Sequence, residues 1–402
     1  MASQINPPRG MRDFLPLEKS SRDQLIQKIA RSYSNHGFQE IETPALEQIE
    51  RLSSGDGGDN EKLAFRVLKR GEELEQALDK SPEELSDLGL RYDLTVPLTR
   101  YYATNQAKLP KIFKAIQIGP VWRAERPQKG RYRQFIQCDI DIIGDETGFA
   151  EIELLNASLD TLKSIGITDA TIRINHRALL TNSISELGID SADQGRAMVT
   201  IDKLDKIGIE GVSNEMSERF GDEVAIKTSS WLNSLSYEMA VPDLLKEIFG
   251  AVSSLHRDKL RYDPTLVRGM GYYTGAIFEI EHPASGTSIG GGGRYDGMVG
   301  KWLGKDVPAV GISLGFERVA ELIDQTQSDD KLLVLVFEQG SELAAFRAQE
   351  QAITAGYQVR LEQKPKKLNL VLENLKEHGY RHFAVLEDPA SGFQGLNIKP
   401  IG

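Results

Sequence analysis

A dense cluster of cations is the first feature of this chain that could do chemistry. Five of the eleven residues 123–133 (RAERPQKGRYR) are Arg or Lys. Alternation along the second strand of a predicted hairpin places Arg131 and Arg133 on one face and Tyr132 on the other. Cations stacked on one face repel each other unless an anion joins them, and arginine binds phosphate in a bidentate manner. A solvated run of surface charge is the alternative, and the spacing favours an anion site.

Two further arginines stand beside glycines. Arg318 lies in the first turn of a predicted helix (GFERV), where a cation opposes the helix dipole at a cost of roughly a few tenths of a kcal/mol. A bound anion would reverse that sign, and a solvated arginine is the alternative. Arg268 lies in LVRGMGYYTG, and Gly290–Gly293 precede RYD. Both patterns indicate close approach of backbone to a ligand, with a plain turn and a flexible linker as the respective alternatives.

Periodicity predicts the elements that must position these residues. A helix is expected over 18–36, and a strand over 38–43 that Pro44 closes. The apolar runs 112–122 and 133–143 flank a turn and predict a long antiparallel hairpin. Residues 51–90 are interpreted as a loop and a charged, solvated segment, and the run Gly290–Gly293 as too flexible for any regular element.

The rest of the chain alternates helices with short strands. Residues 188–260 are mostly helical and are interpreted as an inserted module, and residues 331–402 as a small α/β domain with a parallel sheet. The other expected helices cover 148–166, 177–187, 315–323, 341–355 and 368–379. The other expected strands cover 275–281, 310–314, 332–337, 358–362, 382–386 and a segment near 396–399.

Composition narrows the class of protein. The 402 residues suggest two or three domains, and 40% hydrophobic with 27% charged residues is typical of globular chains. No apolar run is long enough to span a membrane, and no secretory signal is visible. The single cysteine, Cys138, favours a reducing, cytoplasmic setting, and no metal-ligand spacing occurs. A net charge of −11 argues against bulk nucleic-acid coating but allows a local basic site.

Taken together, these segments resemble the class II aminoacyl-tRNA synthetases, specifically the histidyl-tRNA synthetases, over nearly the whole chain. PPRGMRDFLP, with the helix and strand that follow, is similar to the first class-defining motif, which lies at the dimer interface. VWRAERPQKGRYRQFIQ resembles the second motif and VGISLGFERV the third. LVRGMGYYTG and GGGGRYDG resemble the two histidine-specific signatures.

The resemblance implies an α+β fold. Its core would be an antiparallel sheet with flanking helices, carrying a mainly helical insertion and a small α/β C-terminal domain. The catalytic core would comprise 1–187 and 261–325, the insertion 188–260, and an anticodon-binding-like domain 331–402. Family members usually continue past the last strand predicted here, which implies a trimmed version of that domain. Lys364, Lys366 and Lys367 precede a helix there and could meet an RNA backbone, with a solvated loop as the alternative.

The resemblance also implies roles for individual residues. Arg123 and Arg268 would hold the α-phosphate of ATP from opposite sides, and both are the implied catalytic residues. The other ATP-binding residues would be Glu125, Phe135 stacked on adenine, and Arg318 on the other adenine face near the γ-phosphate. The histidine-binding residues would be Asp93, Thr95 and Gln137 at the α-amino group, Asp141 and Tyr273 at the imidazole, and Arg268, Tyr272 and Tyr295. The tRNA acceptor end would meet Gln128, Lys129 and Arg131.

The implied activity is ATP-dependent ligation of L-histidine to tRNA(His) through histidyl-adenylate, with pyrophosphate and AMP released. Mg²⁺ would arrive with ATP, and the protein would be a cytoplasmic homodimer without a membrane partner. Gly271 stands where many relatives carry Asp, which implies altered fine positioning of Tyr272 and Tyr273. The main alternative is the histidine-sensing regulatory subunit of ATP phosphoribosyltransferase, which shares the synthetase core. A synthetase for another amino acid is disfavoured by the two histidine signatures.

Overall fold

The chain forms two compact units, each described here by itself. The computed structural model describes residues 5–53, 63–127, 130–236, 239–268, 272–323, 331–390 and 392–402. One unit contains the N-terminal residues up to Arg12 together with Ile26–Ile323, and the other contains Asp13–Leu25 together with Asp324–Gly402. Helix α1 (Pro16–Asn35) confirms the first predicted helix.

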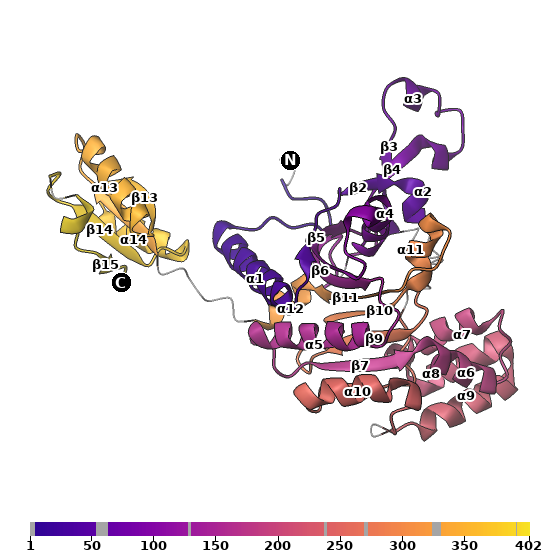
Figure 1. The fold of residues 1–402 in the computed structure, drawn as a ribbon. Helices are drawn as coiled ribbons and strands as arrows, with labels where there is room; N and C mark the ends of the chain where they lie inside the picture. The colour runs from indigo at the N-terminus through magenta and orange to yellow at the C-terminus, as the bar shows by residue number, and fades with distance from the viewer. Residues whose placement is uncertain are drawn as a thin grey trace. The chain divides into compact units, whose positions relative to one another are not determined.

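An eight-stranded sheet in the order β1-β5-β6-β11-β10-β9-β7-β8 is the centre of the first unit (Figure 1). Its pairs are antiparallel except β1–β5 and β7–β8, which are parallel. The strands are β1 (Gln39–Glu40), β5 (Phe113–Trp122), β6 (Gln134–Ile143), β7 (Thr171–His176), β8 (Leu260–Tyr262), β9 (Ala276–Glu281), β10 (Gly290–Arg294) and β11 (Ala309–Gly315).

The predicted long hairpin is confirmed. Strands β5 and β6 pair without interruption from Phe113 opposite Ile143 to Trp122 opposite Gln134. Because side chains alternate across a strand, Gln137, Asp139 and Asp141 of β6 point to the same face of the sheet. This hairpin therefore lines up three polar side chains in a row, and all three are buried.

The prediction that the glycine run forms no regular element is wrong. Gly290–Arg294 is strand β10, paired on both sides with β9 and β11. A Cβ at Gly292 would lie 1.9 Å from the carbonyl oxygen of Gly311, and one at Gly291 would lie 2.6 Å from that of Phe278. Pairing with two neighbouring strands holds this backbone extended, and the absence of side chains permits the close approach.

Short strands were the other source of error. The predicted strand over 38–43 is only the two residues of β1, and strand β7 was not predicted. Within residues 51–90, the described part includes two strands, β3 and β4, which form a three-stranded sheet with β2 in the order β2-β4-β3. Its strands are β2 (Leu46–Gln48), β3 (Phe65–Leu68) and β4 (Ser86–Leu90), with α3 (Glu72–Glu75) and η2 (Pro82–Leu85) between the last two. Such strands are stabilised by partners distant in sequence, so local periodicity does not reveal them.

Helices flank the central sheet. Three of them adjoin the cavity described below: α4 (Thr95–Asn105), α11 (Asp296–Leu303) and α12 (Phe316–Leu322). Two further short helices are α2 (Ile49–Ser53) and η3 (Gln106–Lys108). Helices α5 (Phe149–Ser164) and α10 (Asp243–Leu255) pack on each other. Near one end of β7 lies a helical group (Figure 1): α6 (Arg177–Glu186), α7 (Gln194–Ile201), α8 (Leu204–Phe220) and α9 (Asp222–Ser234). Leu180 and Ile184 of α6 share one buried cluster with residues of α7–α9.

The second unit carries a four-stranded sheet in the order β13-β12-β14-β15. Its strands are β12 (Leu332–Phe337), β13 (Gln358–Gln363), β14 (His382–Leu386) and β15 (Lys399–Pro400), and its helices are α13 (Glu342–Thr354), α14 (Leu368–Glu377) and η4 (Phe393–Gly395). Successive residues of β12 face two different buried clusters, one under α13 and one under α14. The predicted parallel pairing holds for three strands, but β15 is antiparallel to β14 and shorter than expected.

Among the described residues, no helix combines the length and apolar character needed to cross a membrane.

Candidate functional site

A cavity of about 590 Å³ opens on the polar face of the central sheet in the first unit. Strands β6, β9, β10 and β11, the start of α4 and α12, and the α7–α8 junction all contribute to its lining. Of the fifteen site residues named from the resemblance, Gln128 and Lys129 lie outside the described residues, as does Gly271. The other thirteen all line this one cavity: Asp93, Thr95, Arg123, Glu125, Arg131, Phe135, Gln137, Asp141, Arg268, Tyr272, Tyr273, Tyr295 and Arg318.

Four arginines gather around one part of the cavity. Burial lowers the pKa of Arg318, and the positive charges of Arg131, Arg268 and Arg123 lower it further. The Arg318 guanidinium donates to the carbonyl oxygen of Ser288. The mutual repulsion of these four arginines is relieved when an anion binds between them. The arrangement is therefore suited to a polyanion such as a nucleoside triphosphate.

Arg123 is held by the backbone and lies against an aromatic ring. Its Nε donates to the carbonyl oxygen of Tyr92 at 3.0 Å. Its guanidinium carbon lies 5.0 Å from the centre of the Phe135 ring. An aromatic surface beside a cation can accept a flat, electron-rich base together with its phosphates.

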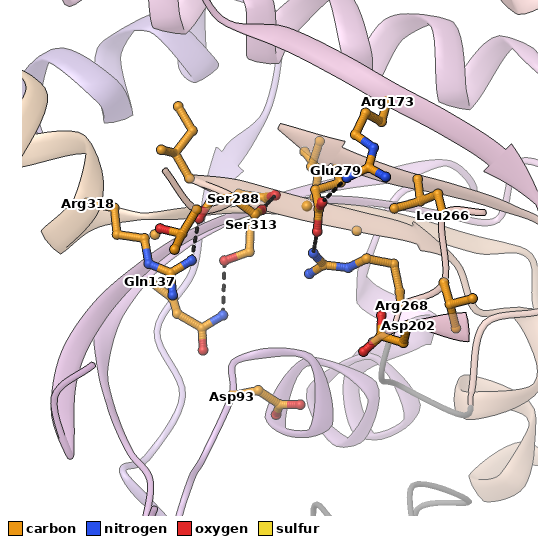
Figure 2. Close-up of a pocket in the computed structure, with 18 of the residues that line it drawn as sticks. Asp93, Gln137, Arg173, Asp202, Leu266, Arg268, Glu279, Ser288, Ser313 and Arg318 are labelled. Carbon is orange, nitrogen blue, oxygen red and sulfur yellow. Dashed lines mark hydrogen bonds and ion pairs between the residues drawn. The ribbon is translucent and has the colours of Figure 1, made fainter. Parts of the chain in front are cut away.

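Arg268 faces Arg318 across this part of the cavity and points toward Glu279 of β9 (Figure 2). Its Nη1 lies 3.0 Å from Glu279 Oε2, and Glu279 Oε1 lies 3.2 Å from Arg173 Nη1. A Cβ on Gly291 would lie 2.7 Å from the Arg268 guanidinium. Glycine at position 291 therefore makes room for this arginine, and Glu279 fixes its direction.

The prediction for residues 131–133 is wrong in one respect. Strand β6 begins only at Gln134, so strand alternation does not govern the three residues before it. Arg131 and Tyr132 both line the cavity, whereas the Arg133 Nε donates to the carbonyl oxygen of Glu125 at 2.9 Å. Arg133 braces the loop backbone and takes no part in the cationic cluster.

A second part of the cavity is acidic. The Tyr295 hydroxyl donates to Asp141 Oδ1 at 2.5 Å. A Cβ on Gly311 would lie 1.8 Å from that oxygen, so the neighbouring strand leaves space for the carboxyl. Burial raises the pKa of Asp141 to about 7 and that of Asp93 to about 6. Both carboxyls are thus poised to ionise when a cationic or proton-donating ligand binds.

Among the described residues that line the cavity, three buried acceptors have no partner: Asp93 Oδ2, Gln137 Oε1 and Asp141 Oδ2. The other carboxylate oxygen of Asp93 accepts from the amide of Val96 at 3.1 Å, which fixes that side chain at the start of α4. Buried polar atoms are nearly always hydrogen-bonded, so three orphaned acceptors in one cavity indicate a ligand rich in N–H donors. An amino acid with a protonated amine and an imidazole is such a ligand.

A family model described as histidyl-tRNA synthetase matches residues 10–319. This chain belongs to the histidyl-tRNA synthetase family. It is 47% identical to a histidine–tRNA ligase of Leifsonia xyli, over 100% of this chain and 99% of that protein. It is 40% identical to one of Aeropyrum pernix, over 78% of this chain and 73% of that protein.

Solved structures support the fold. A histidyl-tRNA synthetase from Nostoc sp. PCC 7120 superposes with a TM-score of 0.77 at 24% identity, covering 99% of this chain and 97% of that one. A protein described as an ATP phosphoribosyltransferase regulatory subunit/histidyl-tRNA synthetase from Bacillus halodurans gives 0.74 at 19% identity, covering 92% and 96%. The predicted class II synthetase fold is confirmed.

Three aromatic rings close the acidic part of the cavity. The ring centres of Tyr272 and Tyr273 are 4.8 Å apart, and those of Tyr272 and Tyr295 are 6.2 Å apart with the rings nearly perpendicular. Tyr273 and Tyr295 are almost fully buried. This aromatic wall leaves the hydroxyl of Tyr295 beside Asp141.

Several cavity residues were not predicted. Asp139 lies between Gln137 and Asp141 on β6, Ser313 lies on β11, and Glu279 lies on β9. The spacing of Gln137, Asp139 and Asp141 in a predicted strand was sufficient to find Asp139. Asp202 and Lys206 come from the α7–α8 junction, and no local pattern marks them as cavity residues.

Proposed function

We propose that this protein ligates L-histidine to tRNA(His) in two steps driven by ATP. The observation that supports it most directly is a single cavity with four arginines in one part and three partnerless buried acceptors in another. The first part suits triphosphate, and the second suits an amino acid that carries an amine and an imidazole. The names of the family and of the relatives agree with this assignment.

Histidine is assigned to the acidic part. Asp93, Thr95 and Gln137 bind its α-amino group, because Asp93 Oδ2 and Gln137 Oε1 are orphaned acceptors and Asp93 is fixed at the start of α4. Asp141 and Tyr273 hold the imidazole. A site built to pair both ring nitrogens rejects amino acids that lack them by about 10⁴–10⁵ in kcat/KM, since its buried polar groups would otherwise stay unpaired.

ATP is assigned to the arginine part. Arg123 and Arg268 hold the α-phosphate from two sides, Phe135 and Arg318 enclose the adenine, and Glu125 lies alongside. The histidine carboxylate attacks the α-phosphorus, a C–O–P bond forms, the bond to the β-phosphate oxygen breaks, and pyrophosphate leaves. Charge accumulates on the phosphoryl oxygens, and the fixed cations stabilise it without a protein nucleophile.

The second step transfers the histidyl group. A hydroxyl of the terminal ribose of tRNA attacks the carbonyl carbon of the adenylate and an ester bond forms. The bond from that carbon to the phosphate oxygen breaks, and AMP leaves with the proton of the hydroxyl on its phosphate. The acceptor end is assigned to Arg131 together with Gln128 and Lys129. Arg131 lines the cavity beside Arg318, so a phosphodiester entering there would approach the reacting carbonyl from the arginine part.

Mg²⁺ fits this site as an ion carried in by ATP. Among the described residues, no group of three or more His, Cys, Asp or Glu side chains could hold a metal ion. Mg²⁺ characteristically binds phosphate oxygens with one or two carboxylates, and Glu125 and Glu317 line the cavity as candidates. The ion would neutralise charge on the leaving pyrophosphate.

The remaining assignments concern organisation. We assign 1–187 and 261–325 to the catalytic core, 188–260 to an insertion, and 331–402 to an anticodon-binding-like domain. We also propose that the protein forms a homodimer through the first motif. We place it in the cytoplasm with the other components of protein synthesis. The histidine-sensing regulatory subunit is the rival, and it gives no reason for Arg123, Arg268 and Arg318 to line one cavity.

The deciding experiment is histidine-dependent exchange of labelled pyrophosphate into ATP. The proposal expects exchange with L-histidine and none above background with other amino acids, followed by charging of tRNA(His) transcript. Histidine binding without any exchange would favour the sensing role and overturn the proposal.

A further inference from the structure

We propose that Asp139 and Ser313 are positioning residues that hold the Gln137 amide with its oxygen facing the amine of the substrate. The inference rests on the proposed function, because it deepens the assignment of Gln137 to the α-amino group. In this proposal neither Asp139 nor Ser313 contacts the substrate. Their effect reaches the substrate through the orientation of one side-chain amide.

The amide of Gln137 is anchored at its nitrogen and unpaired at its oxygen. Its Nε2 donates to Ser313 Oγ at 2.9 Å and to Asp139 Oδ1 at 3.4 Å (Figure 2 shows the bond to Ser313). Its Oε1 is buried and has no partner among the described residues. The sheet register fixes this arrangement, since Ser313 on β11 lies directly opposite Asp139 on β6.

The direction of the hydrogen bonds decides which end of the amide faces the ligand. Burial raises the pKa of Asp139 well above its usual range, the charge of Asp141 raises it further, and a side-chain hydrogen bond with Ser313 acts in the opposite direction. Gln137 Nε2 lies 2.9 Å from Ser313 Oγ and 3.4 Å from Asp139 Oδ1, and both of these oxygens can accept a hydrogen bond. The NH₂ end of the amide has two donors and satisfies both neighbours at once, whereas an ionised Asp139 offers the amide oxygen no donor.

Rotating the amide by half a turn would reverse both ends. The oxygen of Gln137 would then face the Asp139 carboxylate, and the NH₂ group would face the ammonium of the substrate. With Asp139 ionised, both contacts are repulsive. Without Asp139 and Ser313 the two orientations become similar in energy, and the amine of the substrate loses a dependable acceptor. Hydrogen bonds to charged groups are strong enough that about 10-fold in affinity depends on that acceptor.

Three other charged residues influence the ionisation of Asp139. Asp93 and Asp141 raise the pKa of Asp139, and Arg123 acts in the opposite direction. In either protonation state one oxygen of Asp139 can accept from the Gln137 amide. A substrate ammonium bound nearby favours the ionised form, which strengthens the anchor at the time it is needed.

The test compares two ligands that differ only in the amine. Binding of L-histidine and of its desamino analogue, 3-(imidazol-4-yl)propanoate, is measured by titration calorimetry on the full chain without ATP. The ratio of the two dissociation constants reports the contribution of the amine. The variants are Ser313→Ala, Asp139→Ala and the double variant, with Ser313→Thr as the variant that keeps the hydroxyl.

In the double variant we expect the preference for L-histidine to fall about 10-fold, while the analogue binds nearly as in the parent protein. Ser313→Thr should retain most of the preference. A matched control is Ser288→Ala, which removes a hydroxyl bonded to the carbonyl oxygen of Gly290 at 2.7 Å, in the arginine part of the cavity. It should leave the ratio unchanged.

An unchanged ratio in the double variant would overturn the inference, whether both dissociation constants keep their parent values or both rise equally. An equal rise would indicate a merely structural role. Failure of the proposed function gives a different pattern, because the parent protein would then bind neither ligand or show no preference between them.

Discussion

Arg268→Ala should abolish most adenylate formation and leave the fold intact. The guanidinium is fixed by Glu279 at 3.0 Å and lies against the backbone of Gly291, so it is preorganised before ATP arrives. Removing one preorganised donor from the developing charge typically costs about 2.7–4 kcal/mol, or about 10²–10³ in rate. Histidine-dependent pyrophosphate exchange at saturating substrates measures that loss directly.

The structure also indicates why folding should survive. Glu279 keeps Arg173 at 3.2 Å when Arg268 is removed, so no buried carboxylate is left without a cation. We therefore expect a change in the free energy of unfolding of less than about 1 kcal/mol, the usual range for a partly exposed ion pair. Thermal unfolding of both proteins checks this.

Arg261→Ala is the matched control. Its side chain is 24% exposed, as is that of Arg268, and it pairs with Glu281 at 2.9 Å in the same charged network. It does not line the cavity. Exchange within a few-fold of the parent protein is expected. The reasoning fails if Arg268→Ala exchanges at a near-parent rate, or if Arg261→Ala loses as much activity as Arg268→Ala.

The other predictions concern space, pH and RNA. Gly291→Ala places a Cβ 2.7 Å from the Arg268 guanidinium, so exchange should fall at least about 10-fold, whereas Gly297→Ala, with open space around it, should keep exchange near the parent level. The raised pKa of Asp141, about 7, means that the unfolded state loses its proton first, so stability falls as pH rises from about 4 to about 7. In Asp141→Asn the melting temperature should fall less over this pH range. If the melting temperature of the variant depends on pH as in the parent protein, the raised pKa of Asp141 is refuted. Replacing the three lysines before α14 by alanine should lower the salt dependence of full-length tRNA charging by about one unit of slope for each phosphate that they would otherwise neutralise, with minihelix charging unchanged. These are Lys364, Lys366 and Lys367; an equal effect on both RNAs would contradict binding of the anticodon arm by this segment.

The parts of the fold predicted from sequence are those governed by local rules. The hairpin of β5 and β6 follows from two apolar runs and one turn, and the helices follow from their period. Strand β10 could not be found in this way, because four glycines carry no periodicity and their pairing depends on β9 and β11. The same reason applies to β7, whose partners β8 and β9 lie more than eighty residues later in the chain.

In the candidate site, too, some residues follow from local sequence patterns and others depend on partners that are distant in sequence. Asp139 was within reach of sequence reasoning, since period-two spacing in a predicted strand places it beside Gln137 and Asp141. Glu279 was not, because its meaning depends on Arg268 and Arg173 approaching from two other segments. Arg133 shows the opposite error. Strand alternation was applied where the chain had not yet entered the strand, and a loop-bracing arginine was interpreted as part of the anion site.

The glycines explain why residue types alone describe this site incompletely. Its polar groups come from β6, α4 and α12, but the space they need comes from the strands beside them. A Cβ on Gly311 would overlap Asp141, and one on Gly293 would lie 2.8 Å from the Tyr273 ring. At Gly291, Gly293 and Gly311 the missing side chain is therefore matched to a particular functional side chain on another segment. The sequence of the glycine run is compatible with a flexible linker. Only the strands and side chains that pack against it show that it is a strand lining the cavity.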